Sequence, residues 1–193
     1  MGAIAGAAVP RSGQAPRHTD VAIAAALAVL TLLLSIVGLG EWPGITPDEG
    51  WVLQAPRNLV RYGVYGTWSA DGPLPFDPDV TTGPAVLLPV AAAFTTFGDG
   101  LAPARAVVAV YAALAVVAFY AAARASVDRW MAGLSTLLLV LALAPFNRTA
   151  IGEVPALFWM LTGGLAWTRS LEDERRRWAL LAAGCFAMAV MCK

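Results

Sequence analysis

Five uninterrupted apolar segments constrain this chain more than any other feature. The first runs from Val21 to Gly40, and its 20 residues would cover about 30 Å as a helix, the usual thickness of the hydrocarbon core of a bilayer. Backbone groups find no hydrogen-bond partners in lipid, so such segments are predicted to be helices. The other four follow later in the chain: Ala106 to Ala123, Trp130 to Phe146, Val154 to Thr168 and Trp178 to Cys192.

Composition supports the same class. Hydrophobic residues make up 59% of the chain and charged residues 13%, against about 25% charged in soluble domains. We therefore expect an all-α polytopic membrane protein with about five transmembrane helices, in contact with the lipid bilayer and with no nucleic-acid partner. The polar tail 1–20 is not followed by a small-residue cleavage site, so the first span is predicted to be an uncleaved signal anchor.

The apolar segment Pro84 to Phe97 is predicted to lie at the membrane surface. Its 14 residues reach only about 21 Å as a helix, and it contains two prolines. With this segment outside the membrane, most arginines collect on one side and most acids on the other, which is the positive-inside pattern. The arrangement predicts a plasma-membrane protein with a cytoplasmic N-terminus. The arginines on the cytoplasmic side are Arg11, Arg17, Arg124, Arg129, Arg169, Arg175, Arg176 and Arg177.

Residues 41–103 then form one long external loop, which is expected to carry structure of its own. Trp51, Ala55, Leu59 and Tyr62 fall on one helical stripe, which predicts a helix in the membrane interface with a bend at Pro56. The stretch from Gly63 to Gly83 is rich in Gly, Pro and Asp and predicts an ordered, turn-rich loop.

Two short motifs have competing interpretations. Asp77-Pro78-Asp79 has the spacing of a DxD metal motif, but turn chemistry explains it as well. Asn147-Arg148-Thr149 fits a glycosylation acceptor, although it lies too close to the predicted membrane surface for easy modification. The remaining pair, Cys185 and Cys192, matches no zinc or redox spacing and is predicted to serve packing.

The adjacent acids Asp48 and Glu49 are the strongest candidates for chemistry, because charge at a membrane face is costly to keep without a use. The structural alternative is a capping box, since Thr46 precedes Glu49 by three residues and Pro47 suits the first helical position. Glu153 is a second external acid, with an N-cap role for the following helix as its alternative. For Arg105 the alternative is snorkelling at the interface.

The order of these features resembles the N-terminal half of the GT-C membrane glycosyltransferases, closest to the protein O-mannosyltransferase and lipid A aminoarabinose transferase group. The resemblance covers Val21 to Lys193 and lies in order and spacing. It runs from the signal anchor and Asp48-Glu49 through Thr81-Thr82-Gly83-Pro84 to Arg105, Glu153 in Ile151-Gly152-Glu153-Val154-Pro155, and a final span ending at Lys193.

Members of that class transfer a sugar from a polyprenyl-phosphate donor to a lipid, glycan or protein acceptor outside the membrane. The resemblance implies that Asp48 is the base or acceptor-orienting acid, with Glu49 as its partner and Glu153 as the acid of the second loop. Arg105 and Lys193 are the candidates for binding the donor phosphate, because Gly83-Pro84 stands where the aminoarabinose transferases have Lys-Pro. A divalent metal is an alternative counter-ion for the phosphate.

Two further expectations complete the sequence-based account. The alternative function is a non-catalytic membrane protein, either a transporter half or a partner subunit. The chain is also expected to be the N-terminal part of a longer enzyme, because enzymes of the resembled class continue for several more spans. On that view the last carbonyls of the final helix, which ends at Lys193, would be left without hydrogen-bond partners.

Overall fold

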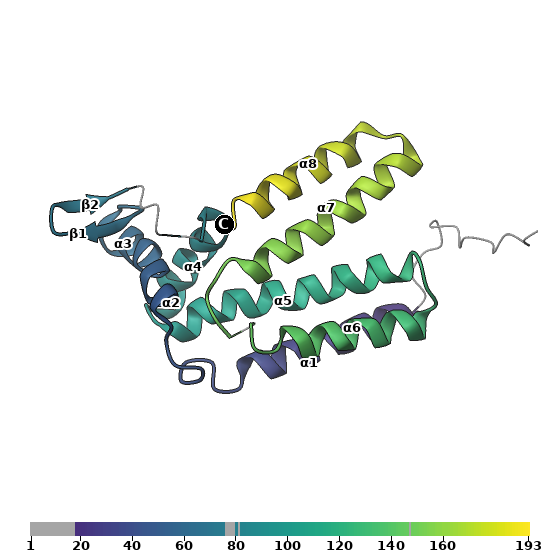
Figure 1. The fold of residues 1–193 in the computed structure, drawn as a ribbon, viewed down its shortest axis with the longest axis horizontal. Helices are drawn as coiled ribbons and strands as arrows, with labels where there is room; N and C mark the ends of the chain where they lie inside the picture. The colour runs from purple at the N-terminus through teal and green to yellow at the C-terminus, as the bar shows by residue number, and fades with distance from the viewer. Residues whose placement is uncertain (1–17, 76–79, 81, 147) are drawn as a thin grey trace, which may run out of the picture.

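The computed structural model describes residues 18–75, 80, 82–146 and 148–193 as a bundle of long helices with a smaller layer at one end (Figure 1). The long helices are α1 (His18–Ile36), α5 (Leu101–Arg124), α6 (Arg129–Leu143), α7 (Glu153–Asp173) and α8 (Arg176–Val190). The layer holds α2 (Pro47–Val52), α3 (Gln54–Tyr62), the strands β1 (Thr67–Ser69) and β2 (Gly72–Leu74), and α4 (Pro84–Phe97).

Each apolar segment forms a helix, as predicted. The short segment forms α4 with the predicted bounds, and α4 packs against α3 and α5 in the layer. Two helices, the 19-residue α1 and the 24-residue α5, are long and apolar enough to cross a membrane. The helices α6 and α8 have 15 residues each and are shorter than a usual span.

Helix α5 lies at the centre of the bundle and contacts α1, α6 and α7, while α8 packs on α7. Its buried positions are mainly alanine and valine, including Ala109, Ala112 and Val116. Small side chains let neighbouring helices approach closely, which is how helices associate in lipid. The composition of α5 therefore suits a central helix surrounded by others.

The predicted stripe on the interfacial helix is wrong in part. Trp51 and Tyr62 are exposed, whereas Val52 is buried together with Ala55. The helix also breaks between α2 and α3 at Leu53, three residues before Pro56. Proline has no N–H for the carbonyl four residues earlier, so the interruption falls in the preceding turn and rotates the buried face.

The turn-rich loop contains a small antiparallel hairpin that the sequence analysis did not predict. Strand β1 pairs with β2 so that Ser69 faces Gly72, and Ala70-Asp71 forms the turn. Gly72 has a φ of 115°, a conformation that glycine adopts readily. The backbone N–H of Asp71 donates to Ser69 Oγ at 3.2 Å. The dipeptide Asp71-Gly72 was the available signal for this turn.

The two ends of the bundle differ. The layer of α2–α4 and the hairpin lies at one end, together with the C-terminal end of α1, the start of α7 and residue 193 (Figure 1). The turns that join α5 to α6 and α7 to α8 lie at the other end. We call these the layered end and the turn end.

Candidate functional site

Glu49 and Arg105 form a buried ion pair at the layered end. Arg105 Nε donates to Glu49 Oε1 at 2.8 Å, and Nη2 donates to Oε2 at 2.7 Å. Both side chains have an exposed fraction of 0%. The remaining donors and acceptors are also used: Arg105 Nη1 donates to the Leu39 carbonyl at 3.0 Å, and the Ala150 N–H donates to Glu49 Oε1 at 2.8 Å.

This ion pair connects four parts of the chain: the end of α1, the start of α2, the start of α5 and the loop before α7. Burying a charged pair is tolerated when geometry is good and the remaining polar atoms are satisfied, and both conditions hold here. In this arrangement the carboxylate and the guanidinium satisfy each other, and neither side chain is exposed to solvent. The pair fixes where α2 sits on the bundle.

This ion pair corrects two structural alternatives, the capping box for Glu49 and interfacial snorkelling for Arg105. Thr46 Oγ1 does accept a hydrogen bond from the Glu49 N–H at 3.2 Å, so Thr46 caps α2 as predicted. The second bond of a capping box is absent, because the Glu49 carboxylate turns to Arg105 instead. Arg105 does not snorkel toward solvent, since it is fully buried.

Asp48 lies beside this ion pair but faces outward. It is the second residue of α2 and is exposed, and within the described residues its carboxylate has no polar partner. The neighbouring Glu49 is locked, so the backbone that carries Asp48 is held in place. Asp48 is thus a free carboxylate on a fixed support.

Glu153 and Lys193 form a second ion pair at the layered end, through Lys193 Nζ and Glu153 Oε1. Their side chains are 46% and 52% exposed, so this pair meets solvent. The N-cap of α7 is Gly152, and Glu153 is the first helical residue, so the predicted N-cap role of Glu153 is wrong. An acid in the first turn still suits the helix dipole.

The chain after α8 packs between the starts of α4 and α7. The Gly83 N–H donates to the Cys192 carbonyl and the Ala85 N–H to the Met191 carbonyl, both at 3.2 Å. The expectation that these carbonyls lack partners is therefore wrong. Gly152 lies against the Cys192 carbonyl so closely that a Cβ atom there would clash. The contact places Lys193 within reach of Glu153.

Other predicted residues lie as follows. Arg148 donates to the Leu34 carbonyl and stacks on Trp42, with 4.9 Å from its guanidinium carbon to the ring centre. Cys185 and Cys192 are free and buried, which confirms their packing role. Asp77-Pro78-Asp79, Thr81 and Asn147 lie outside the described residues. Among those described, no three His, Cys, Asp or Glu side chains group closely enough to hold a metal ion.

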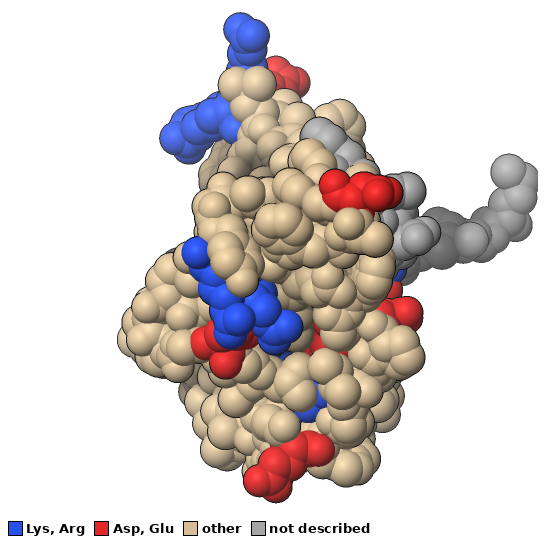
Figure 2. Space-filling model, turned by 90° about the vertical axis from the view of Figure 1, so that its left-hand side faces the viewer, with Lys and Arg blue, Asp and Glu red and all other residues tan. Residues whose placement is uncertain are grey.

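A group that the sequence analysis did not single out lies on the same end. Arg57 and Arg61 both pair with Asp99, at 2.8 Å and 2.7 Å, and tie α3 to the turn between α4 and α5. On the face that carries the hairpin, basic and acidic atoms lie side by side against a mostly uncharged surface (Figure 2). The spacing of the two arginines, four apart on one helix, was the signal available in the sequence.

The site residues therefore fall into two pairs and one free acid. Glu49 with Arg105 and Glu153 with Lys193 were each predicted as site residues, and the structure brings them together as partners. Asp48 stands apart from both pairs as an exposed carboxylate.

Comparisons with protein-family models, curated proteins and solved structures find no match for this chain.

Proposed function

We propose that this protein is a multi-pass membrane glycosyltransferase of the GT-C type, which transfers a sugar from a polyprenyl-phosphate donor on the external face of the plasma membrane. In this proposal α1, α5, α6, α7 and α8 all cross the bilayer and the layered end lies outside. The layer of α2–α4 then rests at the membrane surface.

One observation carries the proposal. Residues far apart in the sequence, Asp48, Glu153 and Lys193, lie at the layered end, while the loops Arg124–Arg129 and Arg169–Arg177 belong to the turn end (Figure 1). Arginine-rich loops on one side are typical of the cytoplasmic face. Acids and a cation on the opposite side are the groups that transfer from a phosphate-linked donor requires.

The proposed chemistry assigns each group one role. Asp48 accepts the proton of the acceptor hydroxyl as the hydroxyl oxygen bonds to the anomeric carbon. The bond between the anomeric carbon and the phosphate oxygen breaks, and its electron pair stays on the phosphate. Lys193, oriented by Glu153, offsets the charge that develops there. Glu49 and Arg105 act as positioning residues that hold α2.

The test compares sugar transfer in membranes of cells that carry the parent gene or Asp48→Asn in the chromosome. Radiolabelled polyprenyl-phosphate hexoses serve as donors. Immunoblotting measures the inserted protein, so that membranes with equal amounts of it are compared. Loss of a general base typically costs about two orders of magnitude or more in turnover. Transfer by Asp48→Asn at nearly the parent rate would remove Asp48 from the site.

A non-catalytic role remains the second candidate, as a transporter half or a partner subunit. The observation that favours it is that four of the five predicted site residues are paired with one another. In that case the membranes would show no donor-dependent transfer attributable to this gene, whatever residue stands at position 48.

A further inference from the structure

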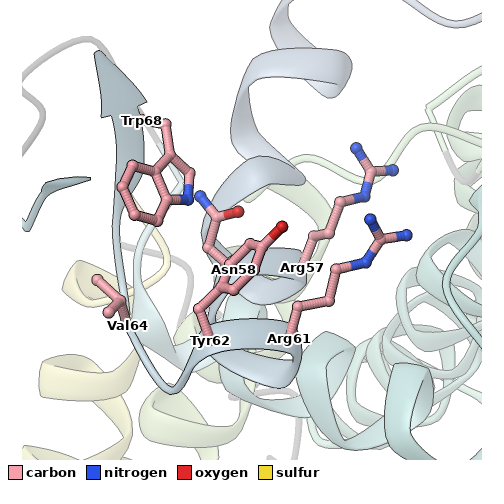
Figure 3. Close-up of a pocket in the computed structure, with 6 residues that line it drawn as sticks. All are labelled: Arg57, Asn58, Arg61, Tyr62, Val64 and Trp68. Carbon is pink, nitrogen blue, oxygen red and sulfur yellow. The ribbon is translucent and has the colours of Figure 1, made fainter. Parts of the chain in front are cut away.

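An open groove lies in the layer, and none of the predicted site residues lines it. It has a volume of about 540 Å³ and is formed by α3 and the chain that leads into β1 (Figure 3). Its lining combines two cations, two aromatic rings, one amide and one aliphatic side chain: Arg57, Asn58, Arg61, Tyr62, Val64 and Trp68. The residue after Val64, Tyr65, packs against the buried cluster of Val52, Ala55 and Leu87, and burial raises the pKa of its phenol.

The arginines give the groove an excess of positive charge. Arg57 and Arg61 extend side by side from α3 (Figure 3), and the single carboxylate of Asp99 neutralises only one of them. Arg57 uses Nε for both Asp99 oxygens, at 3.0 Å and 2.8 Å, and Arg61 uses Nη2. The other guanidinium N–H groups have no acceptor among the described residues, so donors remain for an anion. Guanidinium groups match the geometry of carboxylates and phosphates.

The Trp68 ring lies on one side of Asn58 and Tyr62, and the guanidinium groups of Arg57 and Arg61 lie on the other (Figure 3). Tyr62 and Trp68 are packed edge to face, with ring centres 5.7 Å apart and planes at 86°. They are nevertheless 61% and 45% exposed. Each ring is held in place but left open, so the face of one ring offers a flat apolar surface to a ligand. The C–H face of a pyranose ring is a ligand of that shape.

Asn58 lies between the cations and the Trp68 ring (Figure 3) and is held rigidly. Its side-chain Nδ2 donates to the Gly66 carbonyl at 2.9 Å, and the residue is only 5% exposed. The bond fixes the amide, and no donor within the described residues reaches Oδ1. That oxygen therefore offers a fixed acceptor to a hydroxyl group.

We propose that this groove binds an anionic saccharide. The pyranose ring stacks on Trp68, one hydroxyl donates to Asn58 Oδ1, and a carboxylate or phosphate on the sugar bonds to Arg57 and Arg61. The site is separate from Asp48 and requires no transfer reaction, so it goes beyond the proposed function and does not depend on it.

Equilibrium dialysis with the purified chain in lipid nanodiscs tests the site, with no donor lipid present. Radiolabelled glucuronic acid and glucose 6-phosphate represent the two sources of charge, and glucose is the neutral probe. We expect at least one charged sugar to bind tenfold or more tightly than glucose, because hydrogen bonds to charged groups are the strong ones. The charged sugar that binds more tightly identifies the physiological anion as a carboxylate or a phosphate.

Variants separate the site from non-specific attraction. The double variant Arg57→Gln/Arg61→Gln should weaken binding of the charged sugar about tenfold or more, and Trp68→Ala about fivefold. Arg177→Gln is the control, because it removes an arginine close to a tryptophan ring, 5.3 Å from the ring centre of Trp178, at the turn end and outside the groove. The double variant Arg57→Lys/Arg61→Lys retains both charges. Its binding of the charged sugar reports whether the loss in the double Gln variant comes from misfolding.

Several results would overturn the proposal. Equal binding of glucose and both charged sugars would remove the role of the arginines. Binding that survives the double Gln variant, or that falls equally in Arg177→Gln, would show non-specific attraction. Inorganic phosphate that binds as tightly as glucose 6-phosphate, with no effect of Trp68→Ala, would reduce the groove to an anion site.

Discussion

The layered end and the turn end of the bundle differ in how the chain connects its helices. At the turn end, α5 joins α6 and α7 joins α8 through short turns. At the layered end, α2, α3, the hairpin and α4 stand between α1 and α5 in the chain, and hydrogen bonds join segments far apart in the sequence, such as Ala150 to Glu49. Polar bonds of long range fix the relative positions of several elements, which is what a site assembled from separate loops requires.

Each end also has an ion pair, and the two pairs differ in how far solvent reaches them. At the turn end, Asp20 accepts from Tyr120 and Arg124, both at 2.9 Å, and the Arg124 side chain is 31% exposed. At the layered end, Glu49 and Arg105 are both inaccessible to solvent. Water can replace a lost partner at the turn end but not at the layered end.

The largest effect on stability is therefore expected from Arg105→Ala. It leaves the Glu49 carboxylate buried without a counter-ion, and breaking a buried pair in this way costs about 3–5 kcal/mol. Arg124→Ala is the matched variant at the turn end and should cost about 1 kcal/mol. Denaturant unfolding in detergent micelles, followed by tryptophan fluorescence, measures both losses.

The double variant Glu49→Met/Arg105→Met removes both buried charges at once. Replacement of a buried pair by apolar residues of similar volume is often close to neutral, so much of the stability lost in Arg105→Ala should return. Equal losses for Arg105→Ala and Arg124→Ala would contradict the distinction between the two ends.

Gly152→Ala is expected to have the next largest effect. Its new Cβ would meet the Cys192 carbonyl, a backbone atom that cannot move without disturbing the bonds from Gly83 and Ala85. Overpacking of this kind costs about 1–3 kcal/mol.

The control for Gly152→Ala is Gly184→Ala, within α8, because a Cβ there has no atom within 4 Å. In a helix interior this change should stabilise by up to about 1 kcal/mol. If both variants unfold at the same denaturant concentration, the packing of residues 191–193 against α4 and α7 is wrong.

Lys193→Ala should have the smallest effect on stability, about 0–1 kcal/mol, because its ion pair with Glu153 is half exposed. The same variant should lower sugar transfer if Lys193 offsets charge on the donor phosphate. Parallel unfolding and transfer measurements separate the two roles. A loss of stability as large as that of Arg105→Ala would show that Lys193 is a structural residue.

The helices of this fold could be predicted because their signal is local. Runs of apolar residues predicted α1 and α5–α8. The short length of the segment 84–97 and its two prolines predicted that α4 would lie at the surface. The hairpin was missed because its strands are three residues each, which is too short for an alternating pattern to appear. The register of α2 and α3 was missed because Pro56 shifted the break to Leu53.

The candidate site was predictable in its residues but not in its partnerships. Glu49 and Arg105 are 56 positions apart, and sequence spacing gives no measure of such a contact. The signal that existed was physical: a lone arginine at the start of an apolar helix needs a buried acid or access to water. Arg105 is fully buried, so its partner is the buried acid Glu49 and not water. The neighbouring Asp48 is exposed and takes no part in this pair.

Accessibility labelling of the two ends in intact cells tests whether the layered end lies on the external side of the membrane. In a background with Cys185→Ala and Cys192→Ala, one variant carries Ala70→Cys in the hairpin turn and another carries Ser126→Cys between α5 and α6. Both positions are exposed. A membrane-impermeant maleimide should label Ala70→Cys from outside and Ser126→Cys only after the cells are opened. Labelling of Ser126→Cys in intact cells would contradict the assignment of the layered end to the external face.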